Sequence, residues 1–207
     1  MSSLSFLLFP ILTCLCFVTV MVIVGGGIFL LVRHSVAAMN RTWADLGVRT
    51  GLTLKPAAAF SQPELNGEFR RRPLRVYVYT SGGRRSRTTY TAVALTVNNP
   101  ANSRLEITPS GSMLNFFGKM LNAQDVQIGN PAFDARFVIK SNPQEFAMKV
   151  LGEAGIQMKI MEIPDVFRIG IEGPTLEYHK QGLEENAEFL SKLFNTLSDL
   201  ADRLELN

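Results

Sequence analysis

The first 32 residues contain no Asp, Glu, Lys or Arg, and Arg33 is the first charged residue. This feature constrains the fold most, because so long an uncharged apolar stretch is typical neither of a soluble domain nor of a disordered tail. As a helix, residues 4–32 would reach about 43 Å at 1.5 Å per residue, and a bilayer core measures about 30 Å. The sequence therefore predicts a transmembrane helix over residues 1–33.

Two other N-terminal signals are weaker interpretations of this stretch. A cleaved signal peptide would have a basic segment before a shorter apolar run, and the first residues, MSSLSF, carry no basic side chain. A lipoprotein anchor at Cys14 is not expected either, because Thr13 precedes it where a small residue is required. Cys14 and Cys16 are the only cysteines, so we expect no disulfide in the rest of the chain.

The flanks of the apolar stretch predict its orientation. No basic residue precedes it, whereas Arg33, Arg41, Arg49 and Lys55 follow it. The excess of Lys and Arg marks the cytoplasmic side of a membrane helix. The expected location is the cell inner membrane, single-pass, with the N-terminus outside and the C-terminal domain cytoplasmic.

Three consecutive glycines, Gly25, Gly26 and Gly27, lie in the second half of the apolar stretch. Small residues allow close approach of a neighbouring membrane helix, so these glycines are a candidate site of membrane-helix packing. The alternative is a locally bent stretch without a partner.

The remaining chain divides into a connecting region and one domain. Residues 34–62 are expected to form a juxtamembrane helix and a linker, in which Trp43 packs on the domain. Residues 63–207 are long enough to bury one core. Strands are expected over 74–79, 87–97, 104–108, 133–140, 157–163, 167–172 and 175–179, with a hairpin turn at 81–84 and helices over 112–122 and 144–152.

The last element is an amphipathic helix. Apolar residues recur at steps of four and three from Leu183 to Leu204. The stripe is wide, which favours a helix packed on the sheet over a coiled coil. The sequence therefore predicts an α+β domain with an antiparallel sheet, of a topology similar to a pleckstrin-homology-like split barrel.

Residues that could carry catalysis are scarce. The two histidines are His34, beside the apolar stretch, and His179, near a strand end. Asp134 is interpreted as a partner of Arg136 or as a turn cap. No clustered metal ligands and no phosphate-binding glycine loop occur. We therefore expect no enzyme, no cofactor, no metal, no small-molecule substrate and no nucleic-acid partner.

Charge is distributed unevenly along the chain. Residues 33–100 carry eleven basic and three acidic residues, and residues 101–207 carry ten and fifteen. Candidate contacts to anionic lipid or to an acidic partner are the arginines around the first hairpin, Arg70, Arg71, Arg72, Arg75, Arg84, Arg85 and Arg87. The alternative is a solvated hairpin without a ligand.

Several short motifs resemble a loosely defined group of uncharacterised, membrane-anchored bacterial proteins. They are Trp43-Ala-Asp-Leu-Gly47, the segment 67–78, the segment 129–137 with Gly129-Asn130 where the group often has Gly-Asp, and Asn142-Pro143. The resemblance implies a membrane-tethered cytoplasmic domain, and it implies no activity.

The leading functional hypothesis is a non-catalytic accessory or scaffolding subunit of a larger integral membrane protein complex, for example a respiratory or photosynthetic one. The second is a peripheral adaptor or sensor whose arginines bind membrane lipid or an acidic partner. An enzyme of unrecognised type is the third and weakest.

Overall fold

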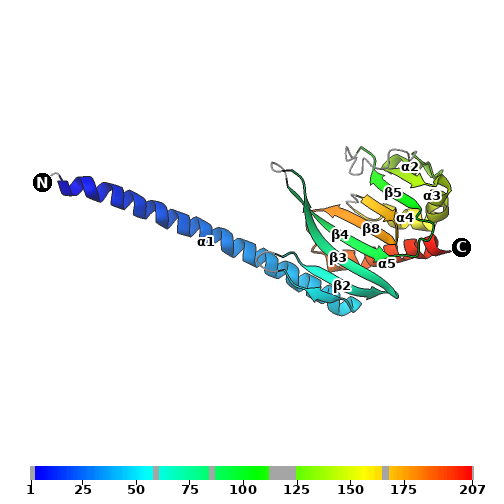
Figure 1. Cartoon of the computed structure of the whole chain (residues 1–207), viewed down its shortest axis with the longest axis horizontal. Helices are drawn as coiled ribbons and strands as arrows, with labels where there is room; N and C mark the ends of the chain where they lie inside the picture. Colours follow the sequence, from blue (N-terminus) through cyan, green and yellow to red (C-terminus); the bar gives the residue numbers. More distant parts are fainter. Residues whose placement is uncertain (1–2, 58–60, 84–86, 112–124, 165–167, 207) are drawn as a thin grey trace. The chain divides into compact units, whose positions relative to one another are not determined.

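A computed structural model of the chain describes residues 3–57, 61–83, 87–111, 125–164 and 168–206 (Figure 1). Within the first helix, the side chains of residues 3–16, 18, 28–33, 35 and 38 lie outside this description. The chain forms two compact units, Met1–Arg41 and Thr42–Asn207. The sequence instead predicted three segments, with boundaries after residue 33 and after residue 62.

Helix α1 extends over Ser3–Thr50 without a break. No helix combines, over its described residues, the length and apolar character that are needed to cross a membrane. The predicted transmembrane helix over 1–33 is therefore wrong, and so is the single-pass inner-membrane location with an outside N-terminus and a cytoplasmic domain.

The end of α1 belongs to the second unit, because its inward-facing residues pack there. Trp43 and Leu46 are fully buried. The Trp43 Nε1–H donates a hydrogen bond of 2.9 Å to the Glu184 carbonyl oxygen. The interpretation that Trp43 packs on the domain is confirmed.

The domain is of the α+β class and contains one antiparallel sheet of eight strands. Its strands are β1 (Thr53–Lys55), β2 (Glu64–Phe69), β3 (Arg72–Ser81), β4 (Thr88–Thr96), β5 (Arg104–Pro109), β6 (Phe137–Asn142), β7 (Arg168–Glu172) and β8 (Thr175–Gln181). Their order in the sheet is β1-β2-β3-β4-β8-β7-β5-β6. The predicted sheet of seven strands with a topology similar to a pleckstrin-homology-like split barrel is wrong, because the sheet has eight strands and β8 pairs with β4 and separates it from β5.

Two further predicted strands are partly or wholly helical. Residues 157–163 fall largely in helix α4 (Ala154–Met161), since Ile156 and Ile160 recur at helical spacing and are both buried. Residues 133–136 belong to helix α2 (Pro131–Arg136), whose first turn is capped by the Asn130 side chain. The expected helix over 144–152 is α3 (Gln144–Leu151), and the one expected over 112–122 lies outside the described residues.

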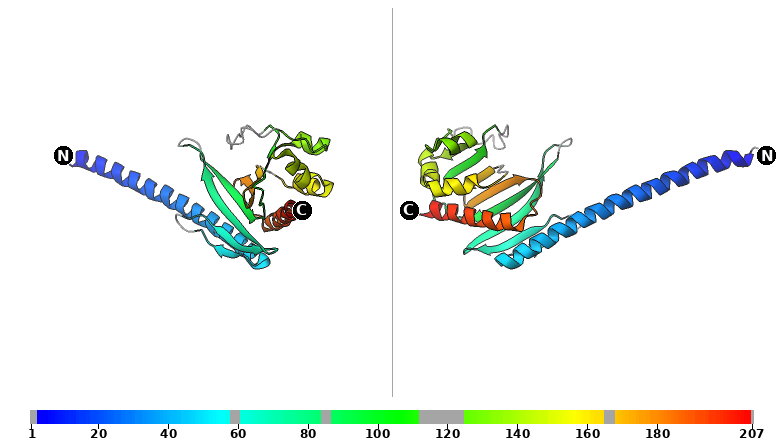
Figure 2. Two further views of the ribbon diagram at one scale, coloured as in Figure 1. Left: turned by 45° about the vertical axis from the view of Figure 1, so that its right-hand side comes forward. Right: turned by 180° about the vertical axis from the view of Figure 1, so that it is seen from behind.

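The hydrophobic core lies between one face of the sheet and the helices. Helix α5 (Ala187–Glu205) buries a wide stripe consisting of Leu190, Leu193, Phe194, Leu197, Leu200, Ala201 and Leu204. Phe194 contacts Phe69 of β2, and the ring of Tyr178 of β8 lies 6.3 Å from Phe189. The stripe therefore packs on the domain, and Figure 2 shows α5 on the same side of the sheet as α3 and α4.

Candidate functional site

The second face of the sheet, opposite the core, carries polar side chains, and we call it the polar face. Side chains alternate between the two faces of a strand. In one row across the sheet, Tyr77 of β3 lies opposite Ala92 of β4, Ala92 opposite His179 of β8, and His179 opposite Arg168 of β7. The sheet thus brings together a tyrosine, a histidine and an arginine that are distant in sequence.

Three side chains of the polar face form a continuous hydrogen-bonded chain. The Tyr79 hydroxyl lies 2.9 Å from His179 Nδ1, and His179 Nε2 lies 3.1 Å from Glu177 Oε2. A carboxylate accepts hydrogen bonds, so the Nε2–H tautomer of a neutral His179 satisfies both contacts. Tyr79 then donates to Nδ1, and the imidazole donates to Glu177.

The surroundings of Glu177 and Tyr79 shift the pKa values of these two groups in opposite directions. The hydrogen bond from His179 lowers the pKa of Glu177 despite the burial of that carboxylate, so Glu177 is ionised at neutral pH. Burial, together with the neighbouring Tyr77 and Tyr90, raises the pKa of Tyr79 to about 12. A phenol that holds its proton so firmly is a poor nucleophile. The chain can accept or donate hydrogen bonds to a ligand, but Tyr79 is not activated.

A buried ion pair lies next to this chain. Arg168 Nε is 3.2 Å from Glu106 Oε1, and both side chains are 9% exposed. The Arg168 guanidinium passes over Gly170, where an added Cβ would come within 2.8 Å of it. A side chain at position 170 would collide with the guanidinium, so the lack of a Cβ at Gly170 makes room for Arg168.

The same face is hollowed beside Tyr77 and Glu177. A hollow of about 430 Å³ extends over β2, β3, β4 and β8. Its side chains on the polar face include Asn66, Arg75, Thr96 and Thr175. This hollow is large enough for a small polar ligand.

The second feature is the turn that joins β2 to β3. It contains only Arg70 and Arg71, with φ values of 49° and 64°. Two residues with positive φ between paired strands form a type I′ turn, which favours Asn-Gly. Arginine at both positions is therefore strained.

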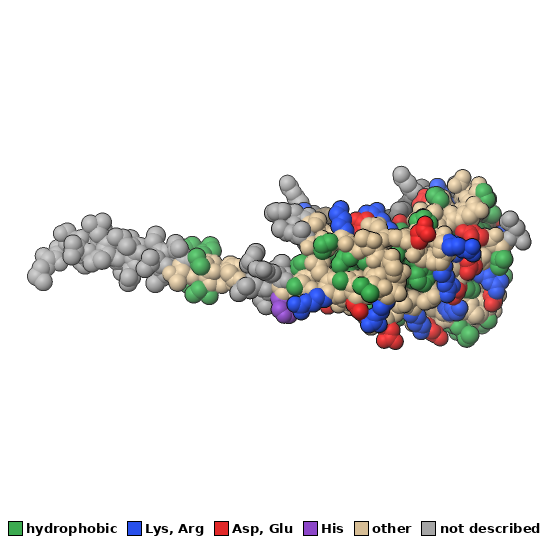
Figure 3. All heavy atoms as spheres, turned by 90° about the horizontal axis from the view of Figure 1, so that it is seen from below, with side chains coloured by type: hydrophobic (Ala, Val, Ile, Leu, Met, Phe, Trp, Pro, Cys, Tyr) green, Lys and Arg blue, Asp and Glu red, His purple; other side chains and the backbone are tan. Residues whose placement is uncertain are grey.

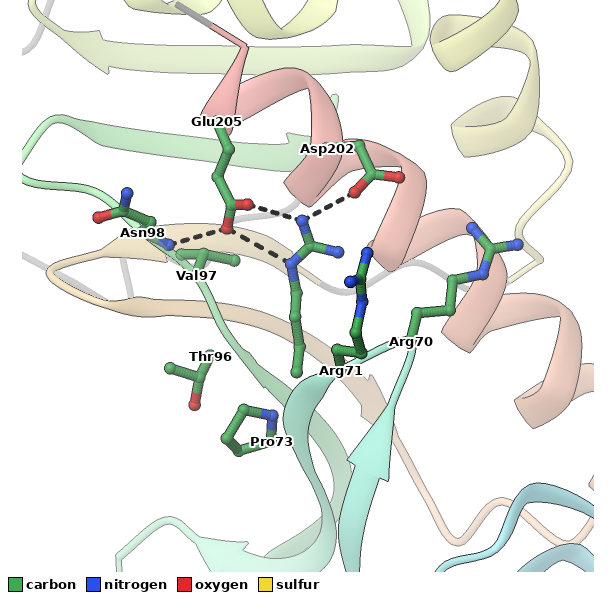
Figure 4. Close-up of a pocket in the computed structure, with 9 residues that line it drawn as sticks. Arg70, Arg71, Pro73, Thr96, Val97, Asn98, Asp202 and Glu205 are labelled. Carbon is green, nitrogen blue, oxygen red and sulfur yellow. Dashed lines mark hydrogen bonds and ion pairs between the residues drawn. The ribbon is translucent and has the colours of Figure 1, made fainter.

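Arg70 and Arg72 are held by carboxylates of α5. Figure 4 shows two of these carboxylates, Asp202 and Glu205, beside the turn. Arg70 Nη1 donates to Asp199 at 2.7 Å. Arg72 Nη2 lies 2.7 Å from both Asp202 and Glu205, and its Nε also donates to Glu205. These contacts tie the hairpin to the C-terminal half of α5, so much of the predicted basic surface is neutralised within the molecule.

Arg71 differs from its two neighbours. Its side chain is exposed, and no carboxylate among the described residues lies within ion-pair distance of it. All three arginines line a hollow of about 730 Å³, together with Pro73, Thr96, Val97, Asn98, Asp202 and Glu205.

The other predicted arginines do not join this cluster. Arg75 pairs with Glu64 at 2.5 Å and lies over the Tyr77 ring. Arg87 is exposed near the start of β4, at the opposite end of the β3–β4 ribbon. Arg84 and Arg85 lie outside the described residues. Figure 3 shows basic and acidic side chains interspersed over one face of the domain.

The third feature is the apolar part of α1. Phe17 and the run from Val20 to Val24 are 53–67% exposed. At Gly25, Gly26 and Gly27 an added Cβ would meet no atom within 4 Å. The predicted packing glycines thus continue the exposed apolar run of residues 20–24.

Asp134 acts as a cap. Its two carboxylate oxygens accept hydrogen bonds from the backbone N–H groups of Ile128 and Gly129, at 2.9 and 3.0 Å. Arg136 instead donates to the Met161 and Ile163 carbonyl oxygens. The turn-cap interpretation of Asp134 describes these contacts. Among the residues that the structure describes, no three His, Cys, Asp or Glu side chains could hold a metal ion together.

The comparisons with known proteins concern the fold. No protein-family model matches the sequence, and no curated protein matches it. The structure is similar to the crystal structure of the mycobacterial trehalose monomycolate transport factor A, TtfA, with a TM-score of 0.58 and 11% sequence identity. The similarity covers 81% of this chain and 94% of that one. At this identity the likeness establishes a shared fold and no shared activity.

Proposed function

We propose that the protein is a non-catalytic accessory subunit of a larger membrane protein complex, and that it docks through the exposed apolar segment of α1 that comprises Phe17 and residues 20–27. The observation that carries this proposal is the exposure of Phe17, Val20, Met21, Val22, Ile23 and Val24, each more than half accessible. Contiguous apolar surface of this kind marks an interaction site.

The geometry of the segment favours enclosure by several partner surfaces. Residues 20–24 are consecutive, and each residue advances a helix by about 100°, so they cover its whole circumference. A helix that is apolar on all sides belongs inside a larger apolar assembly. Gly25, Gly26 and Gly27 would let a partner helix approach the backbone closely.

The class of complex is a further part of the proposal. One protein of similar fold, TtfA, is a transport factor for trehalose monomycolate. We extend only the general role to this chain, an accessory factor of a transport complex, beside the respiratory or photosynthetic complexes that the sequence suggested.

The test is co-purification from native membranes in a mild detergent, followed by size-exclusion chromatography and identification of the co-eluting proteins. The expected result is that the protein elutes within a larger assembly with an integral membrane partner. The double variant Val22→Glu, Ile23→Glu should elute alone, because charges on this segment cannot be buried without partners.

Val48→Glu is the matched control, because Val48 is an apolar residue of the same helix with 85% exposure. It should leave the assembly intact. Elution of the wild-type protein alone, or equal disruption by Val48→Glu, would contradict the proposal.

A further inference from the structure

The turn formed by Arg70 and Arg71 contains one arginine that the fold does not explain. Non-glycine residues in the left-handed region cost about 1–2 kcal/mol each, and strain of this kind concentrates at functional positions. The ion pair with Asp199 accounts for an arginine at position 70. At Arg71 the strain is present without any such contact to a described residue.

The charges around the hollow leave one cation in surplus. Three arginines, Arg70, Arg71 and Arg72, and two carboxylates, Asp202 and Glu205, line the hollow. Arg72 pairs with both of these carboxylates, and Arg70 pairs with Asp199 outside the hollow. The remaining positive charge is that of Arg71.

One of these carboxylates can be displaced at low cost. The Asp202 side chain is 53% exposed, and exposed ion pairs contribute about 0–1 kcal/mol. Glu205 is held more firmly, since it also accepts the Asn98 backbone N–H at 2.9 Å. If Asp202 turns outward, the surplus rises to two positive charges, which matches a dianion.

Donor groups for an anion already line the hollow. Arg71 offers a whole guanidinium, and Nη1 of Arg72 makes no hydrogen bond to a described residue. Thr96 and Asn98 also line the hollow, and the Asn98 backbone N–H already donates to Glu205 (Figure 4). Arginine forks match the oxygen geometry of phosphate.

We infer that the hollow beside the β2–β3 turn binds a phosphate monoester group, with Arg71 as the main contact and Arg72 as the second. The phosphate could belong to a lipid headgroup or to a free phosphate compound, which present the same chemistry. This site is separate from the docking of α1 and does not depend on the proposed function.

The test is calorimetric titration of the full chain in a mild non-ionic detergent. The ligands are inorganic phosphate and dihexanoyl phosphatidic acid, with dihexanoyl phosphatidylcholine as the ligand without a phosphate monoester. Arg71→Gln should weaken binding of both phosphate ligands about tenfold or more, the loss expected for charge-assisted hydrogen bonds.

Arg87→Gln is the matched control, because it removes the same charge from an exposed position at the far end of the ribbon. It should change the affinity less than about twofold, as expected for a surface charge more than a Debye length away. Similar affinity for the two ligands would identify phosphate itself as the group bound. Tighter binding of phosphatidic acid, still lost in Arg71→Gln, would identify a lipid headgroup.

Three results would overturn the inference: neither phosphate ligand binds, the phosphatidylcholine binds equally well, or Arg71→Gln binds like the wild type. Arg71→Gly separates binding from folding, because glycine suits the turn and removes the guanidinium. It should fold and still lose binding.

Discussion

At the scale of single residues, the β2–β3 turn is strained at the residue that we propose to bind phosphate. Arg71 has a φ of 64°, and its side chain makes no ion pair with a described residue. Arg70 has a φ of 49°, and its hydrogen bonds to Asp199 and Asn195 offset the strain at this position. A substitution that relieves the strain should therefore act differently at the two positions.

We expect Arg71→Gly to increase the free energy of unfolding by about 0.5–1 kcal/mol, since the relieved strain exceeds the added entropy of the unfolded chain. Urea unfolding of the full chain measures this change. Arg87→Gly is the control and should not be stabilising, because Arg87 has no positive φ. A destabilised Arg71→Gly would show that the turn is not strained.

At the scale of elements, α5 is fixed by its cap and by its apolar stripe. The Asn186 side chain accepts a hydrogen bond of 3.0 Å from the Phe189 backbone N–H. The helix then buries its stripe against the sheet and against α3 and α4. The cap contribution can be separated from the packing, because Asn186 itself is exposed.

Asn186→Ala should lower the free energy of unfolding by about 1 kcal/mol, the usual cost of losing a side-chain cap. Asn186→Asp keeps an acceptor at the same place and should retain most of the stability. Chemical unfolding curves of the three proteins provide the comparison. Equal loss in both variants would mean that the amide makes some other contact.

Elements with a strict pattern could be predicted from the sequence, and ambiguous ones could not. The stripe on α5 repeats over several turns, so its helix and its packing face were predictable. Residues 157–163 alternate over a short span that also fits helical spacing, and the burial of Ile156 and Ile160 favoured the helix. Helix α2 was not predicted either, because residues 133–136 form too short a span to separate the two periods. The Asn130-Pro131 pair before it is nevertheless a typical helix start.

At the scale of the whole molecule, the two halves of the uneven charge distribution meet. The basic hairpin near residue 70 contacts the acidic end of α5 through Asp199, Asp202 and Glu205. Side-chain hydrogen bonds from Arg72 lower the pKa of Glu205, and those from Lys159 and Arg70 lower the pKa of Asp199 although its burial opposes this. Both carboxylates therefore release their protons more readily in the folded state.

Stability should consequently fall on acidification. A lowered folded-state pKa contributes stability above the unfolded-state value, and this contribution is lost as pH falls through the folded-state value. The model-peptide values are 4.5 for Glu205 and 3.8 for Asp199, so the loss should begin below about pH 5. Thermal unfolding between pH 7 and pH 3 measures it.

Glu205→Gln should flatten this pH profile, because one of the responsible carboxylates is gone. Glu145→Gln is the control, since Glu145 is exposed and makes no ion pair with a described residue. If the pH profile of Glu205→Gln is parallel to that of the wild type, the Arg72 network is not the cause of the stability loss at low pH.

The sequence by itself determined the features that depend on neighbours along the chain. These are the α+β class, the β3–β4 hairpin, the amphipathic α5 and the packing of Trp43, because periodicity and turn residues are local signals. The tertiary structure decided the strand order and everything that depends on it. Pairing of β4 with β8 is non-local, so no local pattern could place Tyr79 beside His179 or Arg72 beside Glu205. The uncharged N-terminal stretch indicated an apolar helix, and only the structure showed that Phe17 and residues 20–24 of that helix are exposed.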